Sequence, residues 1–389
     1  MVREFLPGNR KLLDYESKVH IMTCCMRVIV KGVIYMDYIK DLLAALSVIL
    51  NGLPQGLLAL SMGFASVPTA LGFLVGAAGS LIFGTVAPIS FQAETITLAG
   101  TMGKDKRERL SMVFFGGIGV ALIGAFGLME KIVAFVGPEI TSGMMAGVGI
   151  ILAKVAVDMT KKNKPVGYTS MALGFITYML TKDLVYTITI SVVLSSVLAM
   201  ILKQKLDVKV TGREKLVFQK PTFNLEIFRG AMALVCMNIG ANIAFGKITG
   251  SIASRDVNID YLSIYSSLAD LVSSLFGGGP LESIISATGS APHPVFSGVL
   301  MMTLMAIILF AGLLPKIGKY IPSESIAGFL FVLGAIVTVP DNALTALNTT
   351  IPGGPVVGGI TIAVTAITDP FLGMLAGLII KLFAGIVGM

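Results

Sequence analysis

The sequence has little charge for its length. Charged residues make up 13% of the 389 residues, against roughly 25% in a soluble domain, and hydrophobic residues make up 55%. The mean hydropathy is +0.88. This balance excludes a soluble globular protein and predicts an all-α chain that crosses the membrane many times.

Cysteine, histidine and tryptophan are also scarce. The three cysteines, Cys24, Cys25 and Cys236, lack metal-ligand spacing and are expected to be reduced and structural. Tryptophan is absent, so tyrosine, lysine and arginine must anchor the chain at the membrane surface. Glycines 277–279 lack the Lys-Ser/Thr ending of a phosphate-binding loop, and no nucleophile–base set is visible. We therefore expect no enzyme, no cofactor and no metal.

Hydrophobic runs define about fourteen segments in two sets of seven. A polar, partly amphipathic tail (1–40) precedes them, without the pattern of a cleavable signal peptide. A charged linker, 203–228, separates the two sets. The first set is 41–60, 67–83, 88–103, 110–129, 139–158, 166–181 and 184–202, and the second is 229–250, 260–276, 280–291, 294–314, 322–340, 352–367 and 369–388.

The two sets resemble copies of one unit. A stretch that begins at Pro138 leads to Gly143 and Gly149 in the first set, and one that begins at Pro322 leads to Gly328 and Gly334 in the second, where each glycine lies 185 residues after its counterpart. Since seven is an odd number, the second copy must be inverted across the membrane. The basic loops 104–109, 161–164 and 203–228 would then lie opposite the basic tail. This conflicts with the rule that Lys/Arg-rich loops stay inside, so both orientations remain open.

The third segment of each set is short and broken by glycine and proline. The breaks lie at Gly84 and Pro88 in one set, and at glycines 277–279 and Pro280 in the other. Because a full span needs ~20 residues, 88–103 and 280–291 are expected to be half-helices. Broken backbone survives in lipid only where it faces protein or a watery cavity. Paired breaks in the two halves therefore predict a transporter's binding site.

Each broken segment carries an acid, and acids within the membrane are costly and functional by default. Glu94 lies six residues after Pro88, too deep in its segment for a cap, and Glu282 lies two residues after Pro280. For Glu282, a first-turn acid that complements the helix dipole is an equal alternative. Half-helices that begin at the prolines would face each other with two positive ends. Glu94 and Glu282 are the predicted substrate-binding and proton-coupling residues.

Polar side chains near the breaks complete the predicted substrate site. They are Gln92, Ser283 and Ser286 in the broken segments, Asn238 in 229–250 and Gln55 in the first span, with Ser90 as a further donor. Asn238 and Asn242 share one helix face, and either hydrogen bonding to substrate or contact between helices explains them. We expect contact between helices for one of the two. A packing kink is the alternative for Gln55, and Asp270 is expected to pair with a neighbour.

At these residues the chain resembles the superfamily that joins nucleobase/ascorbate (xanthine/uracil) permeases with sulfate permeases. Residues 41–55 and 83–84 are similar to the start of sulfate permeases, whereas 238–240, 275–280 and 314–328 look more like nucleobase permeases. The resemblance implies a core domain, 41–129 with 229–314, that holds the substrate. It also implies a gate domain, 139–202 with 322–388, through which homodimers often form. The implied setting is a bacterial-type plasma membrane, with a small solute and lipid as partners and no nucleic acid.

The chain departs from nucleobase permeases at two of their acids. Met237 stands where they keep a substrate-binding Glu, and Ser286 stands where they keep another. Our first hypothesis is a proton-coupled secondary active transporter of a nucleobase-like solute such as uracil, xanthine or another purine. The alternative is a sulfate/bicarbonate-type anion transporter, favoured by the helix ends and the net charge of +7 but opposed by the two acids. A channel, a scaffold and a membrane enzyme explain the paired breaks less well.

Overall fold

The computed structural model describes residues 36–202, 216–349, 351 and 353–387. Most of the predicted tail and the first half of the predicted linker, 203–215, therefore lie outside the described residues. Within them, seven helices are long and apolar enough to cross a membrane by length and composition. The chain is an all-α, multi-pass integral membrane protein, as its composition predicted.

The first described helix, Met36–Ser61, already includes residues that the sequence assigned to the tail. Asp37 and Lys40 pair one turn apart at 3.1 Å, which supports helix there. The remaining helices are α2 (Ser66–Phe83), α3 (Ala93–Met102), α4 (Lys106–Ala125), α5 (Met129–Val136), α6 (Pro138–Lys162), α7 (Lys164–Thr181), α8 (Leu184–Ile201), α9 (Leu225–Ile252), α10 (Ile259–Leu275), η1 (Ala287–Ser290), α11 (Pro294–Phe310), α12 (Leu313–Gly318), η2 (Ser323–Ile326), α13 (Ala327–Phe331), η3 (Val332–Thr338), α14 (Val339–Leu347), α15 (Gly354–Ile367) and α16 (Pro370–Val387).

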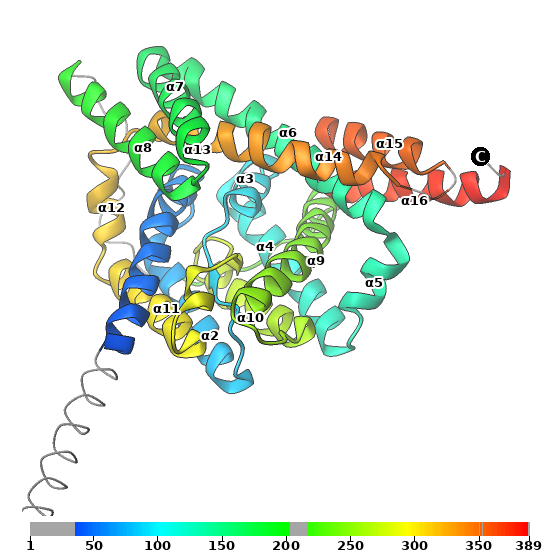
Figure 1. Ribbon diagram of the computed structural model, residues 1–389, viewed down its shortest axis with the longest axis horizontal. Coiled ribbons are helices and arrows are strands. Elements are labelled where there is room, and N and C mark those ends of the chain that lie inside the picture. The colour runs from blue at the N-terminus through cyan, green and yellow to red at the C-terminus, as the bar shows by residue number, and fades with distance from the viewer. Residues whose placement is uncertain (1–35, 203–215, 350, 352, 388–389) are drawn as a thin grey trace, which may run out of the picture.

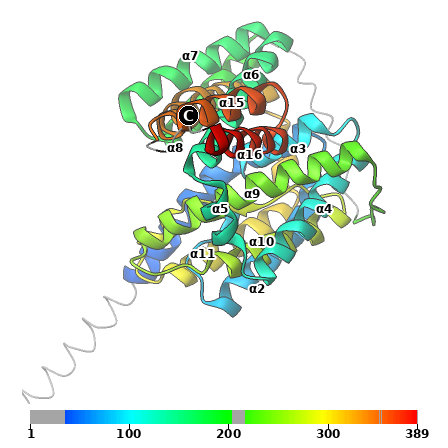
Figure 2. The ribbon, with the colours of Figure 1, turned by 90° about the vertical axis from the view of Figure 1, so that its right-hand side faces the viewer.

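The helices form two packed groups (Figures 1 and 2). In the first group, α2 packs against α10 and α11, and α4 packs against α10 and α9, with α3 beside α9. Gly52 of the first helix lies against Met305 of α11. In the second group, α6 packs against α14 and α15, and α7 packs against α8 and α13. Helix α9 also contacts α16, so it joins the two groups. The division into core and gate domains at the boundaries given above stays a prediction.

Two glycines from the halves of the chain meet inside the second group. A Cβ on Gly334 would lie 2.5 Å from the Gly149 carbonyl oxygen, and a Cβ on Gly149 would lie 2.9 Å from the Gly334 carbonyl oxygen. These glycines are the pair that the 185-residue offset relates. Each contacts the other's backbone, and such reciprocity is the mark of a two-fold contact.

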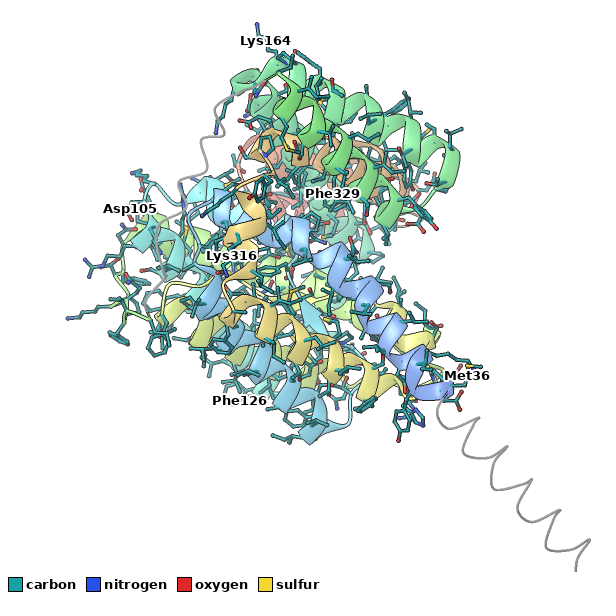
Figure 3. The ribbon with its side chains drawn as sticks, turned by 90° about the vertical axis from the view of Figure 1, so that its left-hand side faces the viewer. Met36, Asp105, Phe126, Lys164, Lys316 and Phe329 are labelled. Carbon is teal, nitrogen blue, oxygen red and sulfur yellow. The ribbon has the colours of Figure 1, made fainter. Side chains whose placement is uncertain are left out.

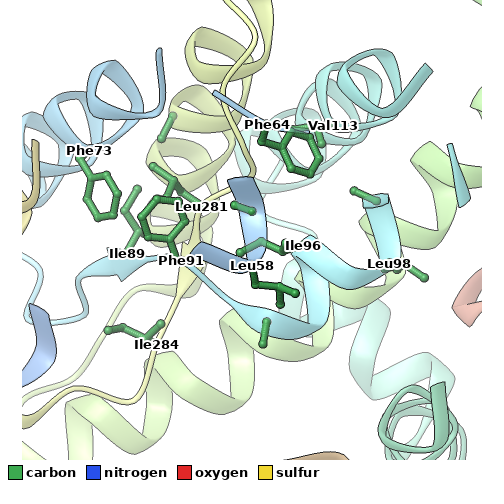
Figure 4. Close-up of a cluster of buried hydrophobic side chains, with 14 of the residues drawn as sticks. Leu58, Phe64, Phe73, Ile89, Phe91, Ile96, Leu98, Val113, Leu281 and Ile284 are labelled. Carbon is green, nitrogen blue, oxygen red and sulfur yellow. The ribbon is translucent and has the colours of Figure 1, made fainter. Parts of the chain in front are cut away.

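The two broken segments meet as an antiparallel ribbon. Strand β1 (Ile89–Ser90) pairs with β2 (Glu282–Ser283), with Ile89 opposite Ser283 and Ser90 opposite Glu282. Glu282 follows Ile89 by 193 residues, and Ser283 follows Ser90 by the same number. Each strand residue therefore pairs with the counterpart of its neighbour, so this pairing is also reciprocal. The sequence analysis did not predict these strands. Around them lie buried apolar side chains, among them Phe91 and Leu281 (Figure 4).

Serines from the preceding helices satisfy the backbone at both breaks. Ser80 Oγ donates to the Thr85 carbonyl oxygen at 2.9 Å, and Ser273 Oγ donates to the Gly279 carbonyl oxygen at 2.7 Å. Ser80 and Ser273 are again 193 residues apart. Backbone polar groups inside a membrane protein must find such partners, and here the protein supplies them.

Only one of the two predicted half-helices is an α-helix. Helix α3 begins at Ala93, after β1, and not at Pro88. The prediction for 280–291 is wrong, because that range contains β2 and the single 3₁₀ turn η1. Pro292 and Pro294 lack an N–H and disfavour helix before them, so regular helix resumes only with α11.

Candidate functional site

The amino-terminal end of α3 lies against the ribbon. The residue before it, Gln92, has an extended backbone and a buried side chain that does not cap the helix. The first turn therefore leaves backbone N–H groups and a positive dipole end at the membrane's interior. Since η1 has one turn, α3 alone provides a helix end here, and the predicted pair of facing ends is wrong.

Glu94 occupies that first turn and is 4% exposed. The sequence analysis placed it deep in a half-helix, which is wrong because the helix starts five residues after Pro88. Its Oε2 atom has no hydrogen-bond partner among the described residues. Glu94 is thus a first-turn acid that complements the dipole and also keeps a free oxygen.

Glu282 lies in β2 and not in a helix, so the dipole reading of this residue is wrong. It is 1% exposed, and its Oε2 accepts a hydrogen bond from the Thr95 hydroxyl of α3. Its Oε1 has no partner among the described residues. Thr95 follows Glu94 in α3, and the N–H of Leu281, the residue before Glu282, donates to Asp270 at 2.7 Å, so the three acids lie around the ribbon and we call them the acid cluster. The sequence analysis missed Thr95, although its place one residue after Glu94 was a signal.

Other buried oxygens near the ribbon also lack partners. Ser90 lies opposite Glu282, and its Oγ approaches Gly52 of the first helix. On that helix Gln55 donates to the Asn51 carbonyl oxygen at 3.4 Å, while Gln55 Oε1 has no partner among the described residues. Ser90 Oγ and Asn238 Oδ1 also lack a partner among the described residues. Asn238 lies on α9, which packs against α3 and β2. Buried polar groups without partners are rare and need an explanation.

Two of the predicted site residues, Ser283 and Ser286, belong to the ribbon and to η1. Ser283 lies opposite Ile89, which packs on Gly76 of α2, so strand alternation turns the Ser283 side chain away from that of Glu282. Its buried Oγ also lacks a partner among the described residues. Ser286 caps η1, where its Oγ accepts from the Thr288 N–H at 3.2 Å.

Asn242 binds Ser263 and Ser266 of α10 at 3.1 and 3.4 Å. It is therefore the asparagine of the pair that joins helices. The Oδ1 atoms of both asparagines lack a partner among the described residues, so what distinguishes Asn242 is the donation by its amide nitrogen to α10.

The acid cluster has no cationic partner. No lysine, arginine or histidine is buried among the described residues, and no ion pair there involves Glu94, Asp270 or Glu282. Asp270 instead accepts from the Leu281 N–H at 2.7 Å and so holds β2 in place, which agrees with the expected pairing. No group of His, Cys, Asp and Glu side chains in the described ranges could hold a metal ion.

Sequence comparison finds no relatives for this chain. No protein-family model matches it. No curated protein matches it either.

Structural comparison does find similar folds. The transmembrane domain of the cyanobacterium bicarbonate transporter BicA is 15% identical, with a TM-score of 0.66 over 88% of this chain and 97% of that one. SLC26A9 is 14% identical, with a TM-score of 0.67 over 100% of this chain and 72% of that one. The murine Slc26a9 anion transporter in the inward-facing state is 14% identical, with a TM-score of 0.62 over 90% of this chain and 68% of that one.

The chain therefore has the fold of the SLC26/SulP anion transporters, which lies within the superfamily expected from the sequence. Of the matched structures, BicA is a bicarbonate transporter and murine Slc26a9 is an anion transporter. The similarity lies on the sulfate-permease side of that superfamily. It offers no support for nucleobases, which the sequence analysis placed first.

Proposed function

We propose that this protein is a secondary active transporter that carries a small anion together with a proton by alternating access. The substrate would bind between the ribbon and the amino-terminal end of α3. The observation that carries the proposal is Glu282, a buried carboxyl with one oxygen held by Thr95, one oxygen free and no cation beside it.

An anion and two carboxylates repel one another in a low dielectric. An unpaired buried carboxylate is itself so costly that the group takes up a proton instead. A protonated Glu282 would donate a hydrogen bond to an anion, which the dipole of α3 would also attract. Binding of the anion and of the proton would then favour each other, which is the basis of symport.

Further polar contacts would come from Glu94, Gln92, Asn238, Gln55 and Ser90. Ser283 and Ser286 support this site through the ribbon and η1 and are not proposed as substrate contacts. The helix groups would act as the core and gate domains of two inverted repeats. The reciprocal contacts at offsets of 193 and 185 residues support this architecture.

Uptake into proteoliposomes tests the function. Labelled bicarbonate, sulfate and a carboxylate would each be offered with and without an acidic outside, beside labelled uracil and xanthine. We expect saturable, acid-stimulated uptake of at least one anion. Glu282→Gln should abolish the acid stimulation, whereas Glu130→Gln, the same change in an exposed ion pair, should not.

A nucleobase is the second candidate, because unpaired carboxyl and amide groups also suit a neutral polar ring. Uptake of uracil or xanthine without any anion uptake would favour it and would overturn the anion proposal. Anion flux that persists unchanged in Glu282→Gln would instead remove the proton from the mechanism.

A further inference from the structure

A second polar site lies in the first group of helices, where α4 begins. A shallow depression runs between α4, the end of α10 and residues 216–223, which we call the linker strap. It lies near Asp105, the residue before α4, far from Met36 at the other end of the group (Figure 3). None of its lining residues belongs to the acid cluster.

Hydrogen bonds hold the linker strap against the two helices. The Gln219 N–H donates to the Leu275 carbonyl oxygen at 2.7 Å, and the Thr222 N–H donates to Ser111 Oγ at 3.0 Å. Arg107 Nε donates to the carbonyl oxygen of Lys220 at 3.2 Å. The strap is therefore a fixed wall, and it carries Lys220 to the side of Arg107.

Among the residues that the structure describes, the cations of this site have no anionic partner. Arg107 and Lys220 line the depression, and Lys106 lies beside Gly277. No carboxylate of the described residues forms an ion pair with any of the three. The nearby acids contact other groups of the protein.

Each acid of this region has a partner of its own. Glu226 pairs with Lys104 at 2.5 Å. Asp105 accepts from the Glu108 N–H at 2.8 Å, and Glu108 accepts from the Lys104 N–H at 2.9 Å. Asp105 and Glu108 keep their negative charge, because a backbone N–H does not neutralise it, but the five cations Lys104, Lys106, Arg107, Arg109 and Lys220 outnumber the three acids, so this region carries a net positive charge.

Apolar side chains also line the site, beside the polar Ser111, Gln219 and Ser274. Leu110 and Phe114 continue the lining along α4, and Phe114 lies about 10 Å deeper than Arg107 along the helix axis. On the strap, Phe218 and Phe223 are 62% and 65% exposed. Free cations at one end and exposed apolar side chains at the other match a lipid's headgroup and acyl chain, and not a dissolved ion.

We propose that the start of α4 and the linker strap bind an anionic phospholipid. Arg107 and Lys220 hold its phosphate, Lys106 adds charge, and Phe114 with the strap phenylalanines contacts its acyl chain. Bound lipid would fasten the link between the two halves of the chain to α4 and α10. This site is independent of the transported solute.

The absence of tryptophan allows a direct test. Phe218→Trp introduces a single tryptophan at the strap, where the Phe218 ring already packs edge-on against Phe276 at 6.3 Å. The full-length protein is placed in phosphatidylcholine vesicles in which either phosphatidylglycerol or phosphatidylcholine carries brominated chains that quench tryptophan. At equal mole fraction, we expect brominated phosphatidylglycerol to be preferred on the order of tenfold, given two cations at the surface.

Arg107→Gln with Lys220→Gln in the same background should reduce this preference to near unity. Lys316→Gln with Lys319→Gln removes the same charge from α12 and the turn after it and should leave the preference intact. Equal quenching by both lipids in the Phe218→Trp protein overturns the proposal, as does a preference that survives in Arg107→Gln/Lys220→Gln. Displacement of the brominated lipid by millimolar inorganic phosphate would show a site for free phosphate and would also overturn it. A thermal unfolding curve for each variant confirms that it is folded.

Discussion

The buried acids of the described residues fall into two sets of three. Asp41, Glu139 and Asp369 each have a basic partner, namely His293 at 2.8 Å, Lys381 at 2.8 Å and Arg229 at 2.5 Å. Glu94, Asp270 and Glu282, the acid cluster, have none. The paired acids lie at helix ends and between helices, whereas the acid cluster surrounds the ribbon. A paired acid can hold helices together, but only an unpaired one is free to exchange a proton with a substrate.

The largest effect that separates the two sets is expected for Glu282→Gln. The amide keeps an oxygen for Thr95 but cannot release or take up a proton. A gradient of one pH unit can drive about tenfold accumulation, and the variant should lose it entirely. Uptake driven by an acidic outside measures this, and counterflow of unlabelled substrate checks that the site still binds. Acid-driven accumulation in the variant would show that the unpaired acids do not couple protons.

Arg229→Gln tests the paired set. The change leaves Asp369 buried without its partner, and because Arg229 is 44% exposed the cost should fall between those of exposed and buried pairs. We expect the free energy of unfolding to drop by about 1–3 kcal/mol. Thermal unfolding in detergent measures the loss. Adding Asp369→Asn should recover part of it, and Lys247→Gln in an exposed pair should have little effect. A stable Arg229→Gln protein with lost transport would reverse the roles that we assign.

Within the acid cluster, Asp270 is expected to have a structural role that differs from the role of Glu282. Asp270→Asn keeps an oxygen for the Leu281 N–H, so transport and its acid stimulation should change by no more than a few-fold. Asp270→Leu removes the acceptor and leaves a buried N–H unpaired, at a cost of about 1–3 kcal/mol in unfolding free energy. If Asp270→Asn abolishes acid stimulation while its stability is unchanged, Asp270 joins Glu282 as a proton carrier.

The smallest effects are expected at the two asparagines of α9. Asn242→Ala removes hydrogen bonds to α10, which in membrane proteins are worth about 0.6 kcal/mol on average, and should leave the KM for substrate unchanged. Asn238→Ala should raise the KM with little change in stability, because its carbonyl oxygen has no partner in the described protein. Paired measurements of KM and unfolding temperature distinguish the two. Opposite results would exchange their roles.

Much of the site was predictable from residues close together in the chain. Glycine and proline at 84–88 and 277–280 identify the two breaks, and the sequence places Glu94, Glu282, Asn238 and Gln55 near them, which as substrate contacts stay predictions. The errors concern local conformation. The third segment of the second half is a strand and a single turn, so Glu282 is not at a helix end, while Glu94 is.

The sequence by itself determined that this is a multi-pass membrane protein with two related halves and paired breaks. Those properties follow from composition and from glycine and proline, which act on neighbouring residues. Only the tertiary structure decided that the breaks pair as strands, that Ser283 turns away from Glu282, and which acids have partners. These outcomes depend on contacts such as that of Thr95 with Glu282, which join residues 187 positions apart. No local pattern encodes such a contact, because its energy exists only once the helices have packed.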